Sequence, residues 1–394
     1  MSQWLRRATW LFGLGVTACD PVVTVGTLPV QPEAVESDAG RTRMDASFVH
    51  ADASSDASSV RGDGSSVPMD ASPAPTSDAA IASSGVVDGG TIVHDAGPLP
   101  EVGPRSRLPW LSGAHAGHEV TDYDAFERWR GRPVDLALFF VDRGNGWPGL
   151  VEPAWPVDML GSLGARLVLA IPLFPESGGN RSDCAAGAYN DQWRKLGPFL
   201  AQRGRGDSII RLGWGANDVG HPWGAEDDPG EYVRCFRQVV SALRGEGPEL
   251  EIAWDFNAAG RPDNTGLDPL SAYPGDDYVD YVGIETFDQY PAATSRDAFR
   301  AACDAPTGLC TLIAFVRARG KRLGLSEWGV AGCGDGGGDN PLYIQLMHEL
   351  FEQHHDAVGF ELYYETGQPP CSMVSHADTS NPLAAERYRA LFGR

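Results

Sequence analysis

From about Leu108 onward, short apolar runs alternate with segments whose apolar residues recur at helical spacing. Eight of these runs predict strands, at 109–113, 134–141, 166–173, 208–213, 250–254, 278–284, 322–326 and 358–363. Between them, periodic segments such as 232–244 and 342–355 predict helices. Strands that are apolar at nearly every position are typical of a parallel sheet covered on both faces.

The number and order of these elements predict the fold class. Eight strands with intervening helices, in fewer than about 300 residues, predict an α/β protein with a (β/α)8 TIM barrel over 105–394. A doubly wound open sheet is the alternative. It is disfavoured because no Gly-x-Gly-x-x-Gly motif follows the first predicted strand.

The first 19 residues predict an export signal. Arg6 and Arg7 precede a short apolar segment at 8–16, which is too short to span a bilayer. The sequence that ends at Cys19 then resembles a bacterial lipobox, in which this cysteine becomes the lipidated N-terminus. An ordinary signal peptide with a coincidental cysteine is the alternative. We expect an exported bacterial lipoprotein, anchored to a membrane in the cell envelope on its periplasmic or cell-surface side.

Residues 20–104 differ in composition from the rest of the chain. Asp-Ala pairs recur among Ser, Gly and Pro, and large apolar residues are few, so this segment predicts a disordered tether. The whole chain has 31 Lys and Arg against 53 Asp and Glu, a formal net charge of -22. That balance excludes nucleic acid as a partner. We expect a monomer, and no motif indicates a cofactor or a metal.

Seven cysteines are present and none forms a Cys-x-x-Cys motif. Without Cys19, six remain, an even number that predicts three disulfides in an exported chain. Cys303–Cys310 is predicted because it encloses a turn-forming segment. Cys333–Cys371 is predicted because it joins segments after two adjacent strands, and Cys184–Cys235 remains by elimination.

Polar and aromatic residues cluster where the predicted strands end. In a TIM barrel the carboxyl ends of the strands form the site. Aromatic faces stack on sugar rings, and carboxylates and amides bind hydroxyl groups, so the set favours a polysaccharide or oligosaccharide ligand. The candidate binding residues are Arg211, Trp214, Asn217, His221, Trp223, Trp254, Glu285, Phe287, Tyr290, Trp328 and Tyr364.

Three segments resemble a known family. Residues 210–214 (IRLGW), with Asn217 and the Pro-Trp at 222–223, are similar to the fourth-strand motif of glycoside hydrolase family 26, which includes the β-mannanases. Residues 273–283 (YPGDDYVDYVG) resemble the approach to its sixth strand, and 325–329 (LSEWG) resemble its seventh-strand motif. The resemblance covers about residues 108–394.

The resemblance implies a retaining mechanism with two carboxyl groups. Glu327 matches the nucleophile, although a lone Glu there could instead be the structural partner of a barrel Arg. The family's acid/base Glu falls on Gly215, and glycine cannot transfer a proton. A general acid contributes about 10² to 10⁴-fold to the rate. A working hydrolase would therefore need a displaced acid, with Asp218, Asp288 and Glu285 as candidates.

Two functions follow from this pattern. The first is retaining hydrolysis of a β-linked polysaccharide, of the mannan type, with Glu327 as nucleophile and a displaced acid/base. The second is a glycan-binding pseudoenzyme that keeps the cleft and lacks the proton donor. Phe287 stands where a hydroxyl would orient the nucleophile, and Tyr290 or Tyr364 are the candidate substitutes.

Overall fold

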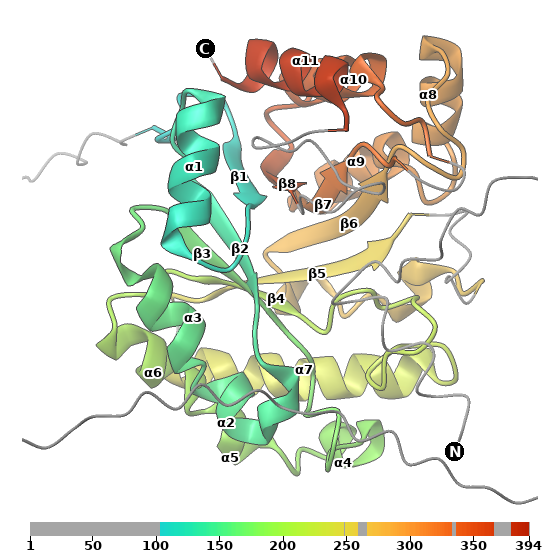
Figure 1. The fold of residues 1–394 in the computed structure, drawn as a ribbon. Coiled ribbons are helices and arrows are strands. Elements are labelled where there is room, and N and C mark those ends of the chain that lie inside the picture. Colours follow the sequence, from blue (N-terminus) through green and yellow to red (C-terminus); the bar gives the residue numbers. More distant parts are fainter. Residues whose placement is uncertain (1–102, 248, 259–265, 333–335, 366–379, 394) are drawn as a thin grey trace, which may run out of the picture. The chain divides into compact units, whose positions relative to one another are not determined.

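Eight parallel strands close into a barrel in the computed structural model, which describes residues 103–247, 249–258, 266–332, 336–365 and 380–393 (Figure 1). Each strand pairs with the next along the chain, and the last pairs with the first, which excludes the open doubly wound sheet. The strands are β1 (Leu111–His115), β2 (Leu136–Phe140), β3 (Arg166–Ile171), β4 (Ile209–Leu212), β5 (Glu251–Asn257), β6 (Tyr281–Phe287), β7 (Arg322–Gly329) and β8 (Val358–Tyr364). All eight predicted strands are confirmed, with ends shifted by a few residues.

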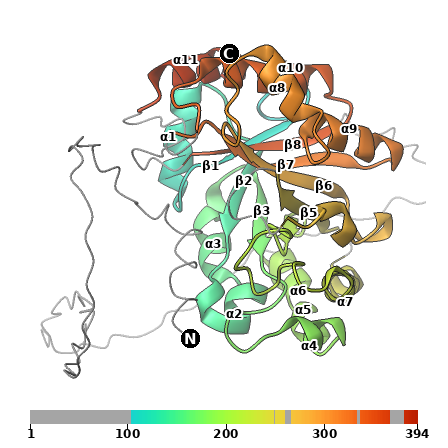
Figure 2. The same cartoon turned by 90° about the vertical axis from the view of Figure 1, so that its right-hand side faces the viewer.

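Helices surround the strands, as two views at right angles show (Figures 1 and 2). The α-helices are α1 (Val120–Arg130), α2 (Gly146–Val151), α3 (Ala154–Met159), α4 (Arg181–Ala185), α5 (Asn190–Trp193), α6 (Leu196–Gln202), α7 (Pro229–Glu246), α8 (Arg296–Cys303), α9 (Leu309–Ala318), α10 (Pro341–Gln353) and α11 (Pro382–Phe392). The 3₁₀ turns within the described residues are η3 (Arg143–Asn145), η4 (Leu160–Ser162), η5 (Pro269–Ala272) and η6 (Asp276–Tyr278). The predicted helices at 232–244 and 342–355 correspond to α7 and α10. No helix in the described part of the chain is long and apolar enough to cross a membrane.

Side-chain caps mark the N-termini of α7, α8 and α10. Asp228 accepts a hydrogen bond from the Glu231 N–H at the start of α7, and Ser295 accepts one from the Ala298 N–H at the start of α8. Asn340 caps α10 in the same way. In α7 and α10 a proline follows the cap, where its missing N–H costs nothing. These caps fix where each chain segment leaves the carboxyl end of the barrel.

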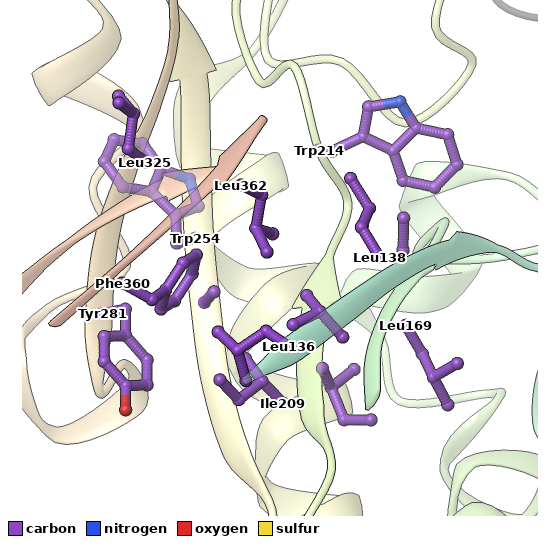
Figure 3. Close-up of a cluster of buried hydrophobic side chains, with 14 of the residues drawn as sticks. Leu136, Leu138, Leu169, Ile209, Trp214, Trp254, Tyr281, Leu325, Phe360 and Leu362 are labelled. Carbon is purple, nitrogen blue, oxygen red and sulfur yellow. The ribbon is translucent and has the colours of Figure 1, made fainter. Parts of the chain in front are cut away.

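The interior of the barrel is filled by apolar side chains below a polar upper layer. Figure 3 shows Leu136, Ile209, Phe360 and Leu362 gathered in this region. Gly283 of β6 permits the close approach of the strands above them, because a Cβ there would lie 2.7 Å from the Cβ of Asp255. The polar residues at the carboxyl end of the barrel therefore pack directly on closely packed apolar side chains.

Two of the three predicted disulfides are confirmed. Cys184–Cys235 joins α4 to α7 with a Cα–Cα distance of 4.9 Å, and Cys303–Cys310 joins α8 to α9 with 4.8 Å. Both distances lie in the range that a disulfide spans without moving the backbone. The third predicted pair, Cys333–Cys371, lies outside the described residues, as do Cys19, the signal segment and nearly all of the predicted tether.

A polar cluster is buried outside the barrel wall, between the strands and helices α1 and α11. Glu361 of β8 accepts hydrogen bonds from the Ser112 hydroxyl and from the Trp328 indole N–H, the latter at 2.6 Å. Arg130 of α1 donates to the same Ser112 hydroxyl at 2.6 Å. Burial raises the pKa of Glu361 to about 7, against the lowering effect of Arg130 and of these hydrogen bonds.

The Glu361→Gln variant is expected to flatten the pH dependence of stability between about pH 4.5 and 7. The folded state holds the Glu361 proton more tightly than the unfolded chain, so this contribution is complete at low pH and is lost as pH rises to about 7. The loss is on the order of 3 kcal/mol. Urea unfolding of both proteins at several pH values measures it, and parallel stability curves would contradict it.

Candidate active site

Arg211 of β4 organises the carboxyl end of the barrel. Its side chain is fully buried and points inward. Its guanidinium donates to carboxylates from three strands: Nε to Asp255 Oδ2 at 2.5 Å, Nη1 to Glu327 Oε1 at 2.5 Å, and Nη2 to Glu285 Oε1. Charge-assisted hydrogen bonds of this kind fix direction as well as distance. One cation therefore ties the ends of β4, β5, β6 and β7 together.

The electrostatics of this cluster keep Arg211 charged. Burial alone lowers the pKa of Arg211, but the carboxylates of Asp255, Glu327 and Glu285 raise it, and the net pKa lies above the ordinary value. Burial, followed by the field of Glu327, likewise raises the pKa of Tyr364 well above its usual range. The Tyr364 hydroxyl therefore stays protonated beside the cluster and can donate a hydrogen bond.

Glu327 reaches the barrel interior because of an irregularity in β7. The register pairs Ile284 with Leu325, and then Glu285 with Glu327, so Ser326 is an extra residue on β7. A bulge of this kind re-aims the following side chain. Glu285 and Glu327 thus lie side by side, with side chains 8% and 10% exposed, and both face Arg211. They are the carboxylates of the cluster that solvent or a ligand can reach.

The loop after β4 contains the position of the missing acid. Gly215 has φ of +60°, in the left-handed region that favours glycine, and its N–H donates to Asp255 Oδ1 at 3.1 Å. A Cβ there would lie 3.1 Å from His221 Nε2 and 3.3 Å from the Cβ of Asp218. The imidazole of His221 stacks on the Trp223 ring, with centroids 4.5 Å apart and planes 15° apart. The space beside Gly215 is therefore occupied by two side chains of the same loop.

Several predicted binding residues hold this loop in place. The Asn217 amide donates to the Asn257 carbonyl at 3.0 Å and accepts from its N–H at 2.8 Å, which joins the loop to the end of β5. Trp214 and Trp223 are buried, and the Trp223 indole donates to the Trp214 carbonyl at 3.0 Å. Their rings support the loop from below, so neither forms an open stacking surface.

Two other predicted binding residues lie outside the barrel wall. Trp254 of β5 packs against Tyr273, with ring centroids 5.4 Å apart, and Figure 3 shows it on the far side of the apolar cluster from Trp214. Trp328 packs against α10 and α11 and donates to Glu361. The structure does not bring these two residues to the carboxyl-end site, because their strands turn these side chains toward the helices.

Phe287 is the last residue of β6, and Tyr290 lies in the loop that follows it. Both line a cavity of about 220 Å³ between this loop and helices α8 to α10. Phe287 also meets the site, since its ring centroid lies 6.0 Å from that of Tyr364. Asp288, a candidate acid, accepts hydrogen bonds from the Ala293 N–H at 2.7 Å and from the Asn340 amide at 2.7 Å. Its carboxyl is therefore engaged in holding the loop.

His115 is a site residue that the sequence patterns did not indicate. It ends β1, points inward, and lies beside Tyr364 with ring centroids 5.0 Å apart. Burial lowers the pKa of His115 to about 4, although its contact with the Leu138 carbonyl raises it, so the ring is neutral at pH 7. The inward alternation of Leu111, Gly113 and His115 is the signal that could have located it.

The site is a cluster of buried and half-buried polar side chains at the carboxyl end of the barrel. In the described residues, no group of three or more His, Cys, Asp or Glu side chains is arranged to hold a metal ion. The carboxylates instead converge on Arg211, with Tyr364 and His115 alongside. Such a set can bind hydroxyl groups, keep a carboxylate ionised for nucleophilic attack, and present neutral donors to a sugar.

Comparison with known proteins supports this interpretation at the level of the fold. A modular endo-β-1,4-mannanase of glycoside hydrolase family 26 from Cellulomonas fimi superposes with a TM-score of 0.54 at 19% identity, over 74% of this chain and 71% of that one. A family 26 protein, GH26C, from a Muricauda species gives a TM-score of 0.52 at 14% identity, over 71% and 85% of the two chains. At these identities the likeness establishes the fold.

One curated relative adds similarity in sequence. A mannan endo-1,4-β-mannosidase from Bifidobacterium adolescentis is 27% identical over 144 residues, which cover 33% of this chain and only 14% of the relative. No family model matches the chain. The resemblance to family 26 inferred from the strand motifs is thus supported for the barrel, and activity and substrate are inferred from the site below.

Proposed function

We propose that the barrel is a retaining glycoside hydrolase that acts on a β-linked polysaccharide of the mannan type, with Glu327 as the nucleophile. The observation that carries the proposal is the placement of Glu327 at the carboxyl end of β7, 2.5 Å from Arg211 and with its side chain 10% exposed. Arg211 holds one oxygen of this carboxylate and keeps the group ionised, which is the state that attacks an anomeric carbon.

The neighbouring groups suit the binding of a sugar at this point. Glu285 lies beside Glu327 on the same guanidinium and can accept hydrogen bonds from sugar hydroxyls. Tyr364 retains its hydroxyl proton, and His115 is neutral at pH 7, so both can serve as uncharged polar contacts. The mannan preference rests on the similarity of the barrel to the Cellulomonas fimi mannanase and on the sequence similarity to the curated mannosidase.

Hydrolysis of defined polysaccharides tests the proposal. The purified protein is incubated with β-mannan, xylan and mixed-linkage glucan, and proton NMR follows the first anomer that is released. Retention of configuration is expected, together with ester formation on Glu327 when a 2-deoxy-2-fluoro glycoside traps the intermediate. An inverted product, or a trapped ester on another residue, would contradict the assignment.

A second candidate function is glycan binding without hydrolysis. It is favoured by the absence of a carboxyl group at position 215, where a glycine in the left-handed region takes the place of the proton donor. Affinity electrophoresis in gels containing each polysaccharide separates the two functions. Retarded migration with no release of reducing sugar supports binding alone, whereas release that depends on Glu327 supports the hydrolase.

We further propose that the barrel, residues 105–394, is attached to a membrane through lipidated Cys19 and a tether formed by residues 20–104. The composition of both segments supports this arrangement, and the two disulfides are consistent with an oxidising, exported location. In a bacterial host that processes lipoproteins, Cys19→Ser is expected to abolish labelling by a palmitate analogue. Unchanged labelling would exclude Cys19 as the acylated residue.

A further inference from the structure

The loop after β4 contains a second ionisable pair, Asp218 and His221, beside the position of the missing acid. His221 Nε2 and Asp218 Oδ2 are 3.5 Å apart. Both side chains border the point where a Cβ of residue 215 would stand. The turn itself is fixed by the hydrogen bond from the Asp218 N–H to the Gly215 carbonyl, at 2.9 Å. A carboxyl group is thus present beside the position where the family motif would place its acid.

Burial distinguishes the roles of the two side chains. Asp218 is 11% exposed, about the same as Glu327, whereas His221 is 2% exposed. His221 is confined by its stacking on Trp223 and its edge contact with Trp214, whose ring centroid is 5.8 Å away. The more exposed carboxyl is the member of the pair that solvent reaches, and the confined imidazole, 3.5 Å from it, can position it.

The other carboxyl groups of the site are less suited to proton donation. Glu285 lies beside Glu327 on the same guanidinium, so the two approach a sugar from one side, whereas a retaining pair flanks the scissile bond. Asp255 is fully buried, and Asp288 is engaged with Ala293 and Asn340. Asp218 lies in the loop after β4, which is three strands away from β7, and this loop reaches the cluster through the Gly215 N–H.

Two charged side chains from neighbouring elements, Arg143 and Asp255, contact the loop that carries this pair. Arg143, from the segment after β2, lies over the rings of Trp214 and Trp223 at 5.8 and 6.0 Å. Its charge is paired with Glu176 at 2.8 Å. On the barrel side, Asp255 accepts from the Gly215 N–H. Arg143, which is paired with Glu176, and Asp255, which is paired with Arg211, are thus the charged groups that contact the Trp214 and Trp223 rings and the Gly215 N–H of this loop.

We propose that Asp218 is the acid/base of the hydrolase, with His221 as its positioning residue, and that glycine at 215 makes room for this pair. The proposal rests on the proposed function, since it names the proton donor of the same site. On this basis Asp218 supplies the carboxyl group that the family motif would place at residue 215, three residues earlier in the same loop. Glycine at 215 is then a requirement of the arrangement.

The proton and electron balance of the reaction is complete with these two carboxyl groups. Glu327 attacks the anomeric carbon, the bond to the leaving oxygen breaks, and its electron pair takes the proton of Asp218. In the second step Asp218, now a carboxylate, accepts a proton from water as the water oxygen bonds the anomeric carbon. The ester electron pair then returns to Glu327, and both residues regain their starting states.

The Asp218→Asn variant tests the assignment through its dependence on the leaving group. On the polysaccharide that the wild type cleaves, kcat is expected to fall about 10² to 10⁴-fold. With a 2,4-dinitrophenyl glycoside of the same sugar, the initial burst of dinitrophenol should be unchanged, because that leaving group needs no proton. Azide should restore turnover and yield a glycosyl azide of retained configuration.

Three further variants define the controls. Asp227→Asn makes the same change on an 87% exposed residue of the same loop and should have wild-type activity. His221→Phe keeps the ring stack and removes the imidazole, so it should lower kcat on polysaccharide with KM and the dinitrophenol burst unchanged. Gly215→Glu should not raise activity, because a side chain is strained in the left-handed region and its Cβ would lie 3.1 Å from His221 Nε2, which would displace the pair.

The outcomes distinguish a failure of the Asp218 assignment from a failure of the proposed hydrolase function. If the polysaccharide reaction requires Glu327 but survives Asp218→Asn, or if Glu285→Gln shows the leaving-group dependence and azide rescue instead, the assignment of Asp218 is overturned and the hydrolase stands. If the folded wild type cleaves neither the polysaccharides nor the activated glycosides, the proposed function is overturned, and the assignment of Asp218 with it.

Discussion

Arg211→Met is expected to destabilise the barrel by about 3 to 5 kcal/mol at pH 7, because it leaves buried carboxylates without their common partner. Asp255 is fully buried, and Glu285 and Glu327 are nearly so, and all three bond the same guanidinium. Methionine fills a similar volume but offers no charge and no donor. Urea unfolding at pH 7, with the midpoint and slope determined for both proteins, measures the loss.

Two comparisons make this result specific to the buried cluster. Arg300→Met removes an exposed arginine that pairs with Asp304 along α8, and it should cost less than about 1 kcal/mol. Lowering the pH should reduce the deficit of Arg211→Met, because protonated carboxyl groups no longer need a cation. Equal losses for the two arginine variants, or a deficit that does not depend on pH, would show that the carboxylates tolerate the loss of Arg211.

Glu327→Gln is expected to lower kcat at least about 10⁴-fold, comparable to removal of a catalytic nucleophile in other hydrolases. The amide has the same shape, and its oxygen can still accept from Arg211, so the fold should be preserved. In contrast to Asp218→Asn, the loss should be equally large on polysaccharide and on a dinitrophenyl glycoside. Steady-state kinetics on both substrates, with circular dichroism as a check on folding, provide the measurement.

Glu285→Gln is the matched comparison for this variant. It makes the same change on the neighbouring strand, on the same guanidinium, and at a similar exposure. Since Glu285 is assigned to sugar binding, its loss should raise KM more than it lowers kcat. If Glu285→Gln were as inactive as Glu327→Gln on both substrates, the nucleophile would not be distinguished from its neighbour, and trapping on Glu327 would become the deciding measurement.

The barrel was predictable because its strands are marked by uninterrupted apolar runs. Each run is buried on both faces, so tertiary contacts and local pattern agree along the whole chain. The disulfides Cys184–Cys235 and Cys303–Cys310 also followed from sequence, the second from the turn-forming segment that it encloses and the first by elimination. Element ends were less accurate, because they depend on caps and on neighbouring loops.

Side-chain direction near the site was much harder to predict. The alternation in β7 before Ser326 would turn Glu327 away from the interior, and only the bulge brings it to Arg211. The same bulge leaves Trp328 facing the helices. A motif can indicate that a Glu is important, but a one-residue change in register depends on packing between strands, which no local pattern records.

The role of Gly215 was also beyond the sequence. A glycine at the expected position of an acid indicates a missing group, and nothing nearby in the sequence indicates a left-handed backbone or an imidazole against it. Both depend on contacts with Trp223 and Asp255, which are 8 and 40 residues away along the chain. The sequence indicated Asp218 as one of three candidate acids, but the contact between Asp218 and His221 beside Gly215 is visible only in the folded loop.

The disulfide Cys184–Cys235 has a consequence for how this part of the molecule responds to damage. It closes a ring of chain, with a sequence separation of 51, that contains the whole of β4 and the loop after it. Arg211, Gly215, Asp218 and His221 all lie within that ring. A protease that cuts the exposed stretch around Asp227 would open the ring without separating its ends, so a nicked molecule remains one covalent unit for as long as its surroundings stay oxidising.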